Sequence, residues 1–255
     1  MSIDLQFRDG LAFMTINRPE ALNALTFGLI QDIGAAFDEV EASDARALII
    51  TGAGEKAFCA GADIKELMGR SQAEAKAGLR LGQTTFAKLD SLRIASIALV
   101  NGYSFGGGTE LALACTFRLA LPSAKFGLPE IKLGLIPGYG GTQRLPRLVG
   151  EARAAEIIMT GRTVDAQEAL DIGLVNRLVE APGIDASIAF AREFTGYSLM
   201  ALKAARSAIQ RGRQLGVSAG MELEADHATL GFQTADANEG MQAFADIRPA
   251  RFEDR

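Results

Sequence analysis

The sequence predicts an α/β fold in which short buried strands alternate with helices. Two apolar runs, Ala47–Ile50 and Ser96–Val100, have the pattern of buried strands, and each leads into a glycine-rich loop and then into helical sequence. From Glu151 onward the chain is mostly helical in pattern. Strand, loop and helix repeated in this order are typical of an α/β core whose loops gather at the ends of the strands.

The N-terminal segment predicts a β-hairpin followed by a helix. Leu5–Arg8 and Leu11–Ile16 have the pattern of strands, and Asp9-Gly10 between them is a turn signal. Thr26 is the expected N-cap of a helix over residues 27–40. The expected apolar face of this helix consists of Leu29, Ile30, Ile33, Phe37 and Val40.

The rest of the chain continues the alternation. After the loop Thr51–Asp63 we expect helical sequence to about Leu92, and Gly134–Thr142 is a further glycine-rich loop. The other expected elements are, in order, the strand Phe117–Leu121, the helices Glu151–Met159 and Asp165–Asp171, the strand Leu174–Val179 and helices from about Asp185 onward. No low-complexity linker interrupts the sequence, so we expect one compact unit with a core over residues 1–190 and a helical C-terminal region over residues 191–255.

The composition is that of a globular protein without a nucleic-acid or membrane partner. The 255 residues are 48% hydrophobic and 22% charged, which allows a sizeable core and excludes wholesale disorder. The net charge of −5 provides no basic field for nucleic acid or an anionic membrane. No apolar run has membrane-spanning length, and no signal or transit peptide is recognisable. Two cysteines, Cys59 and Cys115, fit a reducing compartment, so we expect a cytoplasmic protein.

The residue inventory argues against a metal or a dinucleotide cofactor. One histidine, His227, and no clustered cysteines cannot assemble the usual zinc ligand sets. The sequence has no Gly-Lys-Ser/Thr motif, and its glycine runs lack the spacing of a dinucleotide fingerprint. We therefore expect no metal site and no nicotinamide.

Two glutamates at the ends of glycine- or proline-rich segments are the candidate catalytic residues. Glu110 ends the run Asn101–Glu110, which contains three consecutive glycines, and Glu130 ends the run Ala124–Glu130. A carboxylate in a dry pocket can transfer protons, and two that face one another can hold a water or pass a proton between them. Each glutamate alone is also explained by the preference of acidic residues for the first turn of a helix. The glycine-rich settings favour the catalytic interpretation.

Two glycine-rich loops predict main-chain donors for a developing negative charge. Gly61–Asp63 and Gly106–Gly108 each precede helical sequence. Small residues let a substrate approach the main chain, and N–H groups at the start of a helix have no partner within the helix. Two such groups aimed at one point form an oxyanion hole for a carbonyl that becomes an enolate. Tight turns and close packing are the alternative use of these glycines.

Seven segments carry a resemblance that covers essentially the whole chain. They are Asn17–Leu25, Ala57–Lys65, Asn101–Glu110, Phe126–Glu130, Leu133–Leu145, Thr160–Ala166 and Glu239–Phe244. Together, and in this order, these segments resemble the enoyl-CoA hydratase/isomerase, or crotonase, superfamily.

The resemblance implies a fold, a ligand and an assembly. The family fold is a spiral of repeated ββα units with a helical C-terminal region that trimerises, often as a dimer of trimers. The family ligand is an acyl-CoA thioester, so CoA arrives as part of the substrate and no separate cofactor is expected. Many relatives that isomerise double bonds or cleave carbon–carbon bonds lack one of the two glutamates. Having both favours a hydratase, a lyase of fatty acid or related acyl-CoA metabolism that adds water syn to a trans-2-enoyl-CoA.

The resemblance also assigns roles to residues. The thioester oxygen would lie between the N–H groups of Ala62 and Gly107. Glu110 would orient and activate the water that attacks Cβ, and Glu130 would exchange the proton at Cα. The residues expected to line CoA or to border the water are Ala21, Leu22, Ala60, Asp63, Ile64, Lys65 and Gly138. Ile247 stands where a basic residue is common in the family, so one of the arginines that follow it would have to meet the CoA phosphates.

Three alternatives remain open at this stage. The segment Gly102–Gly106 satisfies the nucleophile-elbow pattern, and a serine hydrolase could use Ser104, His227 and an aspartate such as Asp171. A second alternative is a subunit that binds acyl-CoA or a protein without turnover, although two buried carboxylates are costly to desolvate. The third keeps the fold and changes the reaction to that of an isomerase, or of a specialised dehydratase or lyase.

Overall fold

In residues 2–255, which the computed structural model describes, ten strands form two sheets. The larger sheet has the strand order β1-β2-β3-β5-β7-β10 and the smaller one β4-β6-β8-β9. The strands are β1 (Ile3–Arg8), β2 (Leu11–Ile16), β3 (Ala47–Gly52), β4 (Ala57–Cys59), β5 (Ala95–Val100), β6 (Tyr103–Phe105), β7 (Phe117–Ala120), β8 (Lys125–Gly127), β9 (Val164–Asp165) and β10 (Arg177–Leu178).

Helices connect the strands and form the C-terminal part of the chain, so the predicted α/β class is confirmed. They are α1 (Phe27–Ala42), α2 (Ile64–Leu67), α3 (Gln72–Ser91), α4 (Gly107–Ala114), α5 (Gly141–Arg144), α6 (Pro146–Val149), α7 (Glu151–Thr160), α8 (Ala166–Asp171), α9 (Ile184–Arg192), α10 (Leu199–Gly212), α11 (Val217–Gly231) and α12 (Ala235–Ala245). Two short 3-10 helices, η1 (Pro19–Ala21) and η2 (Pro129–Leu133), complete the set.

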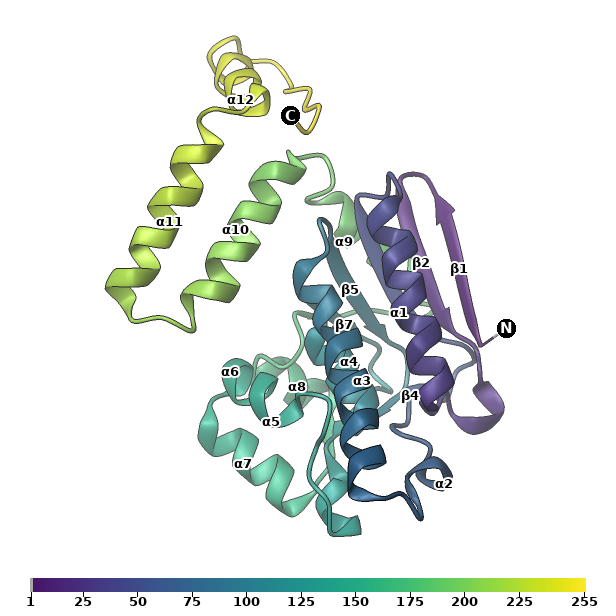
Figure 1. Cartoon of the computed structure of the whole chain (residues 1–255). Coiled ribbons are helices and arrows are strands. Elements are labelled where there is room, and N and C mark those ends of the chain that lie inside the picture. The colour runs from purple at the N-terminus through teal and green to yellow at the C-terminus, as the bar shows by residue number, and fades with distance from the viewer. Residues whose placement is uncertain (1) are drawn as a thin grey trace. The chain divides into compact units, whose positions relative to one another are not determined.

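The chain divides into two compact units. One contains the chain up to Leu92 together with Ser96–Ala189, and the other contains Arg93–Ala95 and Phe190–Arg255. In Figure 1, α1–α8 belong to the first unit and α10–α12, in green and yellow, belong to the second. The candidate catalytic glutamates, the oxyanion donors and the residues expected to line CoA belong to the first unit, whereas the arginines expected to meet the CoA phosphates belong to the second. Within the described residues, no helix is long and apolar enough to cross a membrane.

The predicted N-terminal elements are confirmed. β1 and β2 pair antiparallel through a turn at Asp9 and Gly10. Thr26 caps α1, because its side-chain oxygen accepts a hydrogen bond from the Leu29 N–H at 3.0 Å. All five side chains of the predicted apolar face are buried. This face therefore anchors α1 in the core, and α1 also packs along α3 (Figure 1).

The central strands of the larger sheet run parallel. β2 pairs with β3, and β5 pairs with β7, which also pairs with β10. Ala47–Ile50 and Ile97–Val100 are buried throughout, as continuous apolar runs in parallel strands covered on both faces should be. The strand predicted over Leu174–Val179 is shorter than expected, because only Arg177–Leu178 pairs with β7.

The sequence pattern does not reveal the smaller sheet, because β4, β6 and β8 lie in segments expected to be loops. Strands of three residues are too short to show a period of two, so the pattern could not reveal them. β6 pairs parallel with both β4 and β8. The carboxyl ends of parallel strands meet at one edge of a sheet. The segments that begin at Ala60, Gly106 and Leu128 therefore come together there.

Candidate active site

Glu110 lies in the first turn of α4 and is held by two main-chain donors. α4 begins after Gly106, whose φ of 50° and ψ of −124° favour a residue without a Cβ. Glu110 is 1% exposed. Its Oε1 accepts hydrogen bonds from the N–H groups of Tyr139 and Gly141, both at 2.7 Å. Oε1 is occupied by the main chain, whereas in residues 2–255 no hydrogen bond is formed to Oε2, so Oε2 is the oxygen left to bind a water.

The environment of Glu110 shifts its acidity toward neutrality. Burial raises the pKa of Glu110 to about 7, because a charged carboxylate is poorly solvated there. The Gly141 N–H lowers this pKa, the nearby Glu130 carboxylate raises it further, and the N–H of Tyr139 lowers it again. A carboxyl group with a pKa near 7 can accept and release a proton at neutral pH, as general acid–base catalysis requires.

Glu130 lies in η2 and faces the N-cap of α4. It is half-buried, and burial raises its pKa. A Cβ at Gly106 would lie 2.9 Å from Glu130 Oε1, so this carboxylate packs against the start of the helix that carries Glu110. Among the described residues, the buried Oε2 of Glu130 has no hydrogen-bond partner. An unsatisfied buried acceptor costs about 1–3 kcal/mol, so this oxygen is poised to bind a group from outside the chain.

The loop that contains Ala62 is clamped by Leu25. The two residues form an isolated parallel bridge. The Leu25 N–H donates to the Gly61 carbonyl at 2.8 Å, and the Asp63 N–H donates to the Leu25 carbonyl at 2.8 Å. Within residues 2–255, the N–H of Ala62 itself donates to no acceptor. Its position is therefore fixed while its donor stays free.

Gly107 provides the second free main-chain donor. It is the first residue of α4, where an N–H group has no partner within the helix. This N–H too has no acceptor in the described part of the chain. A Cβ at Gly61 would lie 3.0 Å from the Phe105 carbonyl oxygen and 3.7 Å from Gly106 Cα, so the two loops are in contact. The arrangement can serve as an oxyanion hole.

The residues expected to line CoA lie on two adjoining segments, the end of η1 and the start of α2. They are Ala21, Leu22, Ala60, Asp63, Ile64 and Lys65. The Ala60 N–H donates to the Leu22 carbonyl at 3.0 Å, which joins the segments. Asp63 caps α2 by accepting from the Lys65 N–H at 3.2 Å. Leu22 and Ile64 are exposed apolar side chains at this place.

The sequence points to Gly138 in this loop, but it does not identify the main-chain donors that hold Glu110. The N–H groups in question belong to Tyr139 and Gly141. Backbone donors leave no side-chain signature, so only the glycine-rich composition of Gly134–Thr142 could have indicated them. The Gly138 carbonyl accepts from Gln83 Nε2 of α3 at 2.8 Å, which ties the loop to that helix.

The alternative serine nucleophile has the wrong surroundings. Ser104 is fully buried in β6, and its hydroxyl lies 3.5 Å from the hydroxyl of Thr109. Asp171 is exposed at the end of α8, and His227 belongs to α11 in the second unit. In the described residues Asp171 forms no hydrogen bond with Ser104, and burial keeps the Ser104 hydroxyl from the surface, whereas a nucleophile elbow exposes its serine.

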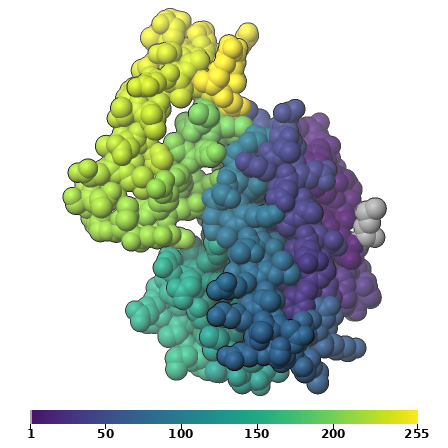
Figure 2. Space-filling view, in the orientation of Figure 1, coloured from purple at the N-terminus to yellow at the C-terminus, as the bar shows by residue number. Residues whose placement is uncertain are grey.

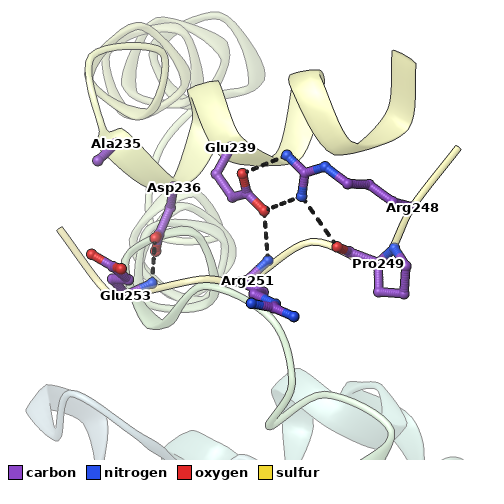
Figure 3. A pocket seen from close by; sticks show the side chains of 7 residues that line it. All are labelled: Ala235, Asp236, Glu239, Arg248, Pro249, Arg251 and Glu253. Carbon is purple, nitrogen blue, oxygen red and sulfur yellow. Dashed lines mark hydrogen bonds and ion pairs between the residues drawn. The ribbon is translucent and has the colours of Figure 1, made fainter. Parts of the chain in front are cut away.

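Two cavities contain neither of the candidate catalytic glutamates and none of the expected oxyanion donors, and the first is lined by the two arginines considered for the CoA phosphates. The first, of about 640 Å³, is lined by Asp236, Glu239, Arg248, Arg251 and neighbouring residues of the second unit (Figure 3). There Arg248 donates to both oxygens of Glu239, at 2.7 and 2.9 Å, and is thereby engaged. The second, of about 840 Å³, lies in the first unit and is lined in part by residues of β1 and β2. In residues 2–255 no group of three or more His, Cys, Asp or Glu side chains could hold a metal.

Comparison with known proteins gives one consistent result. The family model for enoyl-CoA hydratase/isomerase matches residues 6–255. The crotonyl-CoA hydratase of Syntrophomonas wolfei is 41% identical over 253 residues, which cover 98% of this chain and 97% of the relative. The short-chain-enoyl-CoA hydratase of Clostridium acetobutylicum is 39% identical over 249 residues, which cover 97% and 95%.

The solved structures agree with the sequence comparison. The crystal structure of the enoyl-CoA hydratase from Bacillus anthracis matches with a TM-score of 0.95 at 37% identity and covers all of both chains. DspI of Pseudomonas aeruginosa matches with a TM-score of 0.93 at 34% identity, over 98% of this chain and 96% of that one. The predicted crotonase-like fold is thereby confirmed. The chain belongs to the enoyl-CoA hydratase/isomerase family.

Proposed function

We propose that the protein is an enoyl-CoA hydratase, a lyase that adds water reversibly to the double bond of a trans-2-enoyl-CoA and yields a 3-hydroxyacyl-CoA. The observation that carries the proposal is the pair of buried glutamates: Glu110 has one oxygen bound by two N–H groups, and Glu130 has a buried oxygen without a partner. Relatives at 41% and 39% identity that are named as hydratases support it.

The reaction needs a carbonyl oxygen that can carry negative charge between two bond-forming events. The N–H groups of Ala62 and Gly107 stabilise this oxyanion, and loss of one such donor typically costs about 3 kcal/mol. Glu110 holds the water through Oε2 and accepts its proton as the oxygen bonds to Cβ. Glu130 delivers a proton to Cα on the same face, which makes the addition syn. A proton then passes from Glu110 to Glu130 and restores the starting state.

The acyl-CoA thioester is the substrate in this proposal, and no separate cofactor takes part. CoA lies along Ala60–Lys65 and the end of η1, where the exposed apolar side chains of Leu22 and Ile64 offer contact surface. The Gly138 loop borders the attacking water, because its N–H groups hold the Glu110 carboxylate that binds this water. The enzyme acts in the cytoplasm, in fatty acid or related acyl-CoA metabolism, and its two free cysteines suit such a reducing compartment.

The proposal includes a homotrimer, or a dimer of trimers, assembled through the helical second unit. Figure 2 shows the surface of this unit in green and yellow. Several of its large apolar side chains are strongly exposed, with Val217 at 81%, Phe244 at 87% and Ile247 at 94%. Apolar side chains exposed to this extent on neighbouring helices are typical of surfaces covered by another chain.

The product formed from crotonyl-CoA tests the proposed reaction. A hydratase converts it to 3-hydroxybutyryl-CoA, which mass spectrometry detects as a gain of one water and which is accompanied by loss of the conjugated thioester absorbance. An isomerase shifts the double bond without a change in mass, and a hydrolase releases free CoA. Product with the mass of substrate, or free CoA as the main product, would overturn the assignment.

A further inference from the structure

We propose that Glu66 is a positioning residue, whose carboxylate fastens residues 64–70 to the start of α1 and thereby orders a segment that would bind CoA. This inference rests on the proposed hydratase function and adds a residue to its site. α2 follows closely after the oxyanion donor Ala62, and Ile64 and Lys65 in its first turn are among the residues expected to line CoA. A contact that holds α2 in place therefore also holds these CoA-lining residues.

The carboxylate of Glu66 binds the start of a helix that lies 39 residues earlier in the chain. Its Oε2 accepts a hydrogen bond from the Phe27 N–H at 2.7 Å. Phe27 is the first residue of α1, where an N–H group has no partner within the helix. The negative carboxylate also lies at the positive end of the helix dipole, which strengthens the contact. Glu66 therefore joins α2 to α1 (Figure 1).

A second contact from the same segment reaches the same residue. The Arg70 guanidinium lies over the Phe27 ring, with Cζ 4.2 Å from the ring centroid. Arg70 Nε also donates to the Glu66 carbonyl, so the two contacts with Phe27 come from one folded segment. The ring itself packs against α3, since a Cβ at Gly78 would lie 2.2 Å from its Cε1. Phe27 is thus held by α3 and can anchor α2.

Few other contacts hold this segment. Within residues 2–255, no other hydrogen bond joins residues 64–70 to an element beyond α2 and its flanking turns. Two of its apolar side chains are exposed, Ile64 at 45% and Met68 at 73%. Ala62, by contrast, is held by its own isolated bridge. Loss of the Glu66 contact should therefore loosen the CoA-lining residues and leave the oxyanion donor in place.

A loosened segment must be ordered each time the substrate binds. Ordering of side chains and loops on binding lowers affinity by about two- to tenfold for each residue immobilised. This cost is the same for the bound substrate and for the transition state, so it raises KM and leaves kcat unchanged. A thioester that lacks most of CoA makes no use of the segment and should not bear the cost.

The test compares crotonyl-CoA with crotonyl-N-acetylcysteamine, a thioester that carries the same acyl group on a short fragment of CoA. In Glu66→Ala the KM for crotonyl-CoA should rise about tenfold, while kcat stays within about twofold of the wild type. The kcat/KM for the N-acetylcysteamine thioester should be unchanged. Glu66→Gln should keep the KM for crotonyl-CoA within about threefold of the wild type, because its amide oxygen can still accept from the Phe27 N–H.

Glu74→Ala is the matched control for the loss of a carboxylate at the start of a helix. Glu74 Oε2 accepts from the Ser71 N–H at 2.8 Å, but both residues belong to the N-terminus of α3, so this contact joins no second helix. The control should keep the KM and kcat of the wild type. A rise in its KM equal to that of Glu66→Ala would overturn the inference, because the loss of any such carboxylate would then explain the effect.

Trypsin gives a readout that does not depend on activity. Arg70 is exposed at the end of the segment, so cleavage after it reports how often the segment opens. Cleavage at this site, followed by mass spectrometry, should be at least about fivefold faster in Glu66→Ala than in the wild type and in Glu66→Gln. Desulfo-CoA or CoA should slow the cleavage in the variant. Equal cleavage rates in all three proteins would contradict the proposed contact.

The outcomes separate this inference from the proposed function. A wild type that does not hydrate crotonyl-CoA contradicts the hydratase assignment itself. A wild type that hydrates it, with a folded Glu66→Ala of equal KM, overturns the role of Glu66 and leaves the assignment intact. An equal loss of kcat/KM on both thioesters also overturns it, because the reacting groups would then be disturbed. If Glu66→Ala does not fold, Glu66→Ser takes its place, since its side chain is also too short to reach Phe27.

Discussion

The chemistry of the candidate site is set at single residues by what surrounds them. Glu110 is an ordinary carboxyl group in the sequence, and its burial in the first turn of α4 makes it a proton carrier near neutral pH. Its Oε1 is bound by two N–H groups, so the carboxylate has one orientation and one free oxygen. Glu130 differs in its unpartnered buried oxygen. Glu110 and Glu130 are chemically equal side chains in different environments. Different environments give two carboxyl groups different acidities, so that one can act as an acid and the other as a base.

The raised pKa of Glu110 predicts a pH-dependent stability. In the folded state this carboxyl has a pKa of about 7, whereas its ordinary value is 4.5, so folding favours the protonated form. The folded state therefore loses stability as the pH rises from 4.5 through 7, by about 3 kcal/mol at 1.36 kcal/mol per pKa unit. Glu110→Gln has no carboxyl to titrate at this position, so the variant should not show this loss of stability. Urea unfolding at pH 5 to 8, at one protein concentration, should show the variant gaining stability relative to the wild type as the pH rises. Parallel curves would contradict the assigned pKa.

The elements bring the site together through close approaches that only glycine permits. Gly108 lies in α4 directly over β4, and a Cβ there would be 1.9 Å from the Cys59 carbonyl oxygen. At this position α4 and β4 are so close that no side chain larger than the hydrogen of glycine fits between them. Because α4 carries both Glu110 and the N–H of Gly107, a displacement of the helix moves the proposed base and the proposed oxyanion donor together.

Gly108→Ala is therefore expected to lower kcat/KM on crotonyl-CoA by about 100-fold, since a shift of about 1 Å in a catalytic group has that effect. Gly231→Ala is the matched control: Gly231 ends α11, and a Cβ there would meet nothing within 4 Å. The control should retain wild-type kinetics. Wild-type kcat/KM in folded Gly108→Ala would show that the position of α4 does not govern the reaction.

The elements also show how far the sequence could lead. α1 was predictable because Thr26 is a cap and the buried side chains of the helix repeat at helical spacing over about three turns. β4 and β6 were not, because three residues show no period and their pairing connects segments more than 40 residues apart. The two glutamates could be singled out by residue type and glycine context. The N–H groups of Tyr139 and Gly141 could not be singled out in this way. Almost every residue has a backbone N–H, and only the fold determines where it points.

At the scale of the whole molecule, the candidate catalytic residues belong to the first unit, whereas the three most exposed large apolar side chains of the described residues, Val217, Phe244 and Ile247, belong to the second. Glu110, Glu130, the oxyanion donors and the residues expected to line CoA lie in the first unit, whereas the arginines expected to meet the CoA phosphates follow α12 in the second. The second unit consists mainly of α10–α12, and α11 and α12 bury few side chains of their own. A helical region that exposes Phe244 and Val217 gains stability when another chain covers them.

The proposed assembly predicts the mass of the particle in solution. Light scattering after size exclusion should give three or six times the 27.0 kDa of the chain. Phe244→Asp combined with Ile247→Asp, at two of the most exposed apolar positions, should lower this mass or make it depend on protein concentration. A wild-type mass of 27.0 kDa at micromolar concentration would contradict a trimer.

The most direct measurement of the central claim is the rate of crotonyl-CoA hydration by the wild type, Glu110→Gln and Glu130→Gln, followed by loss of the conjugated thioester absorbance. General acid–base catalysis contributes about 10²–10⁴-fold per group, so each variant should lose at least about 100-fold in kcat while still binding a CoA ligand. Circular dichroism and ligand binding confirm that the variants are folded. Rapid hydration by either folded variant would contradict an account in which both carboxylates carry the reaction.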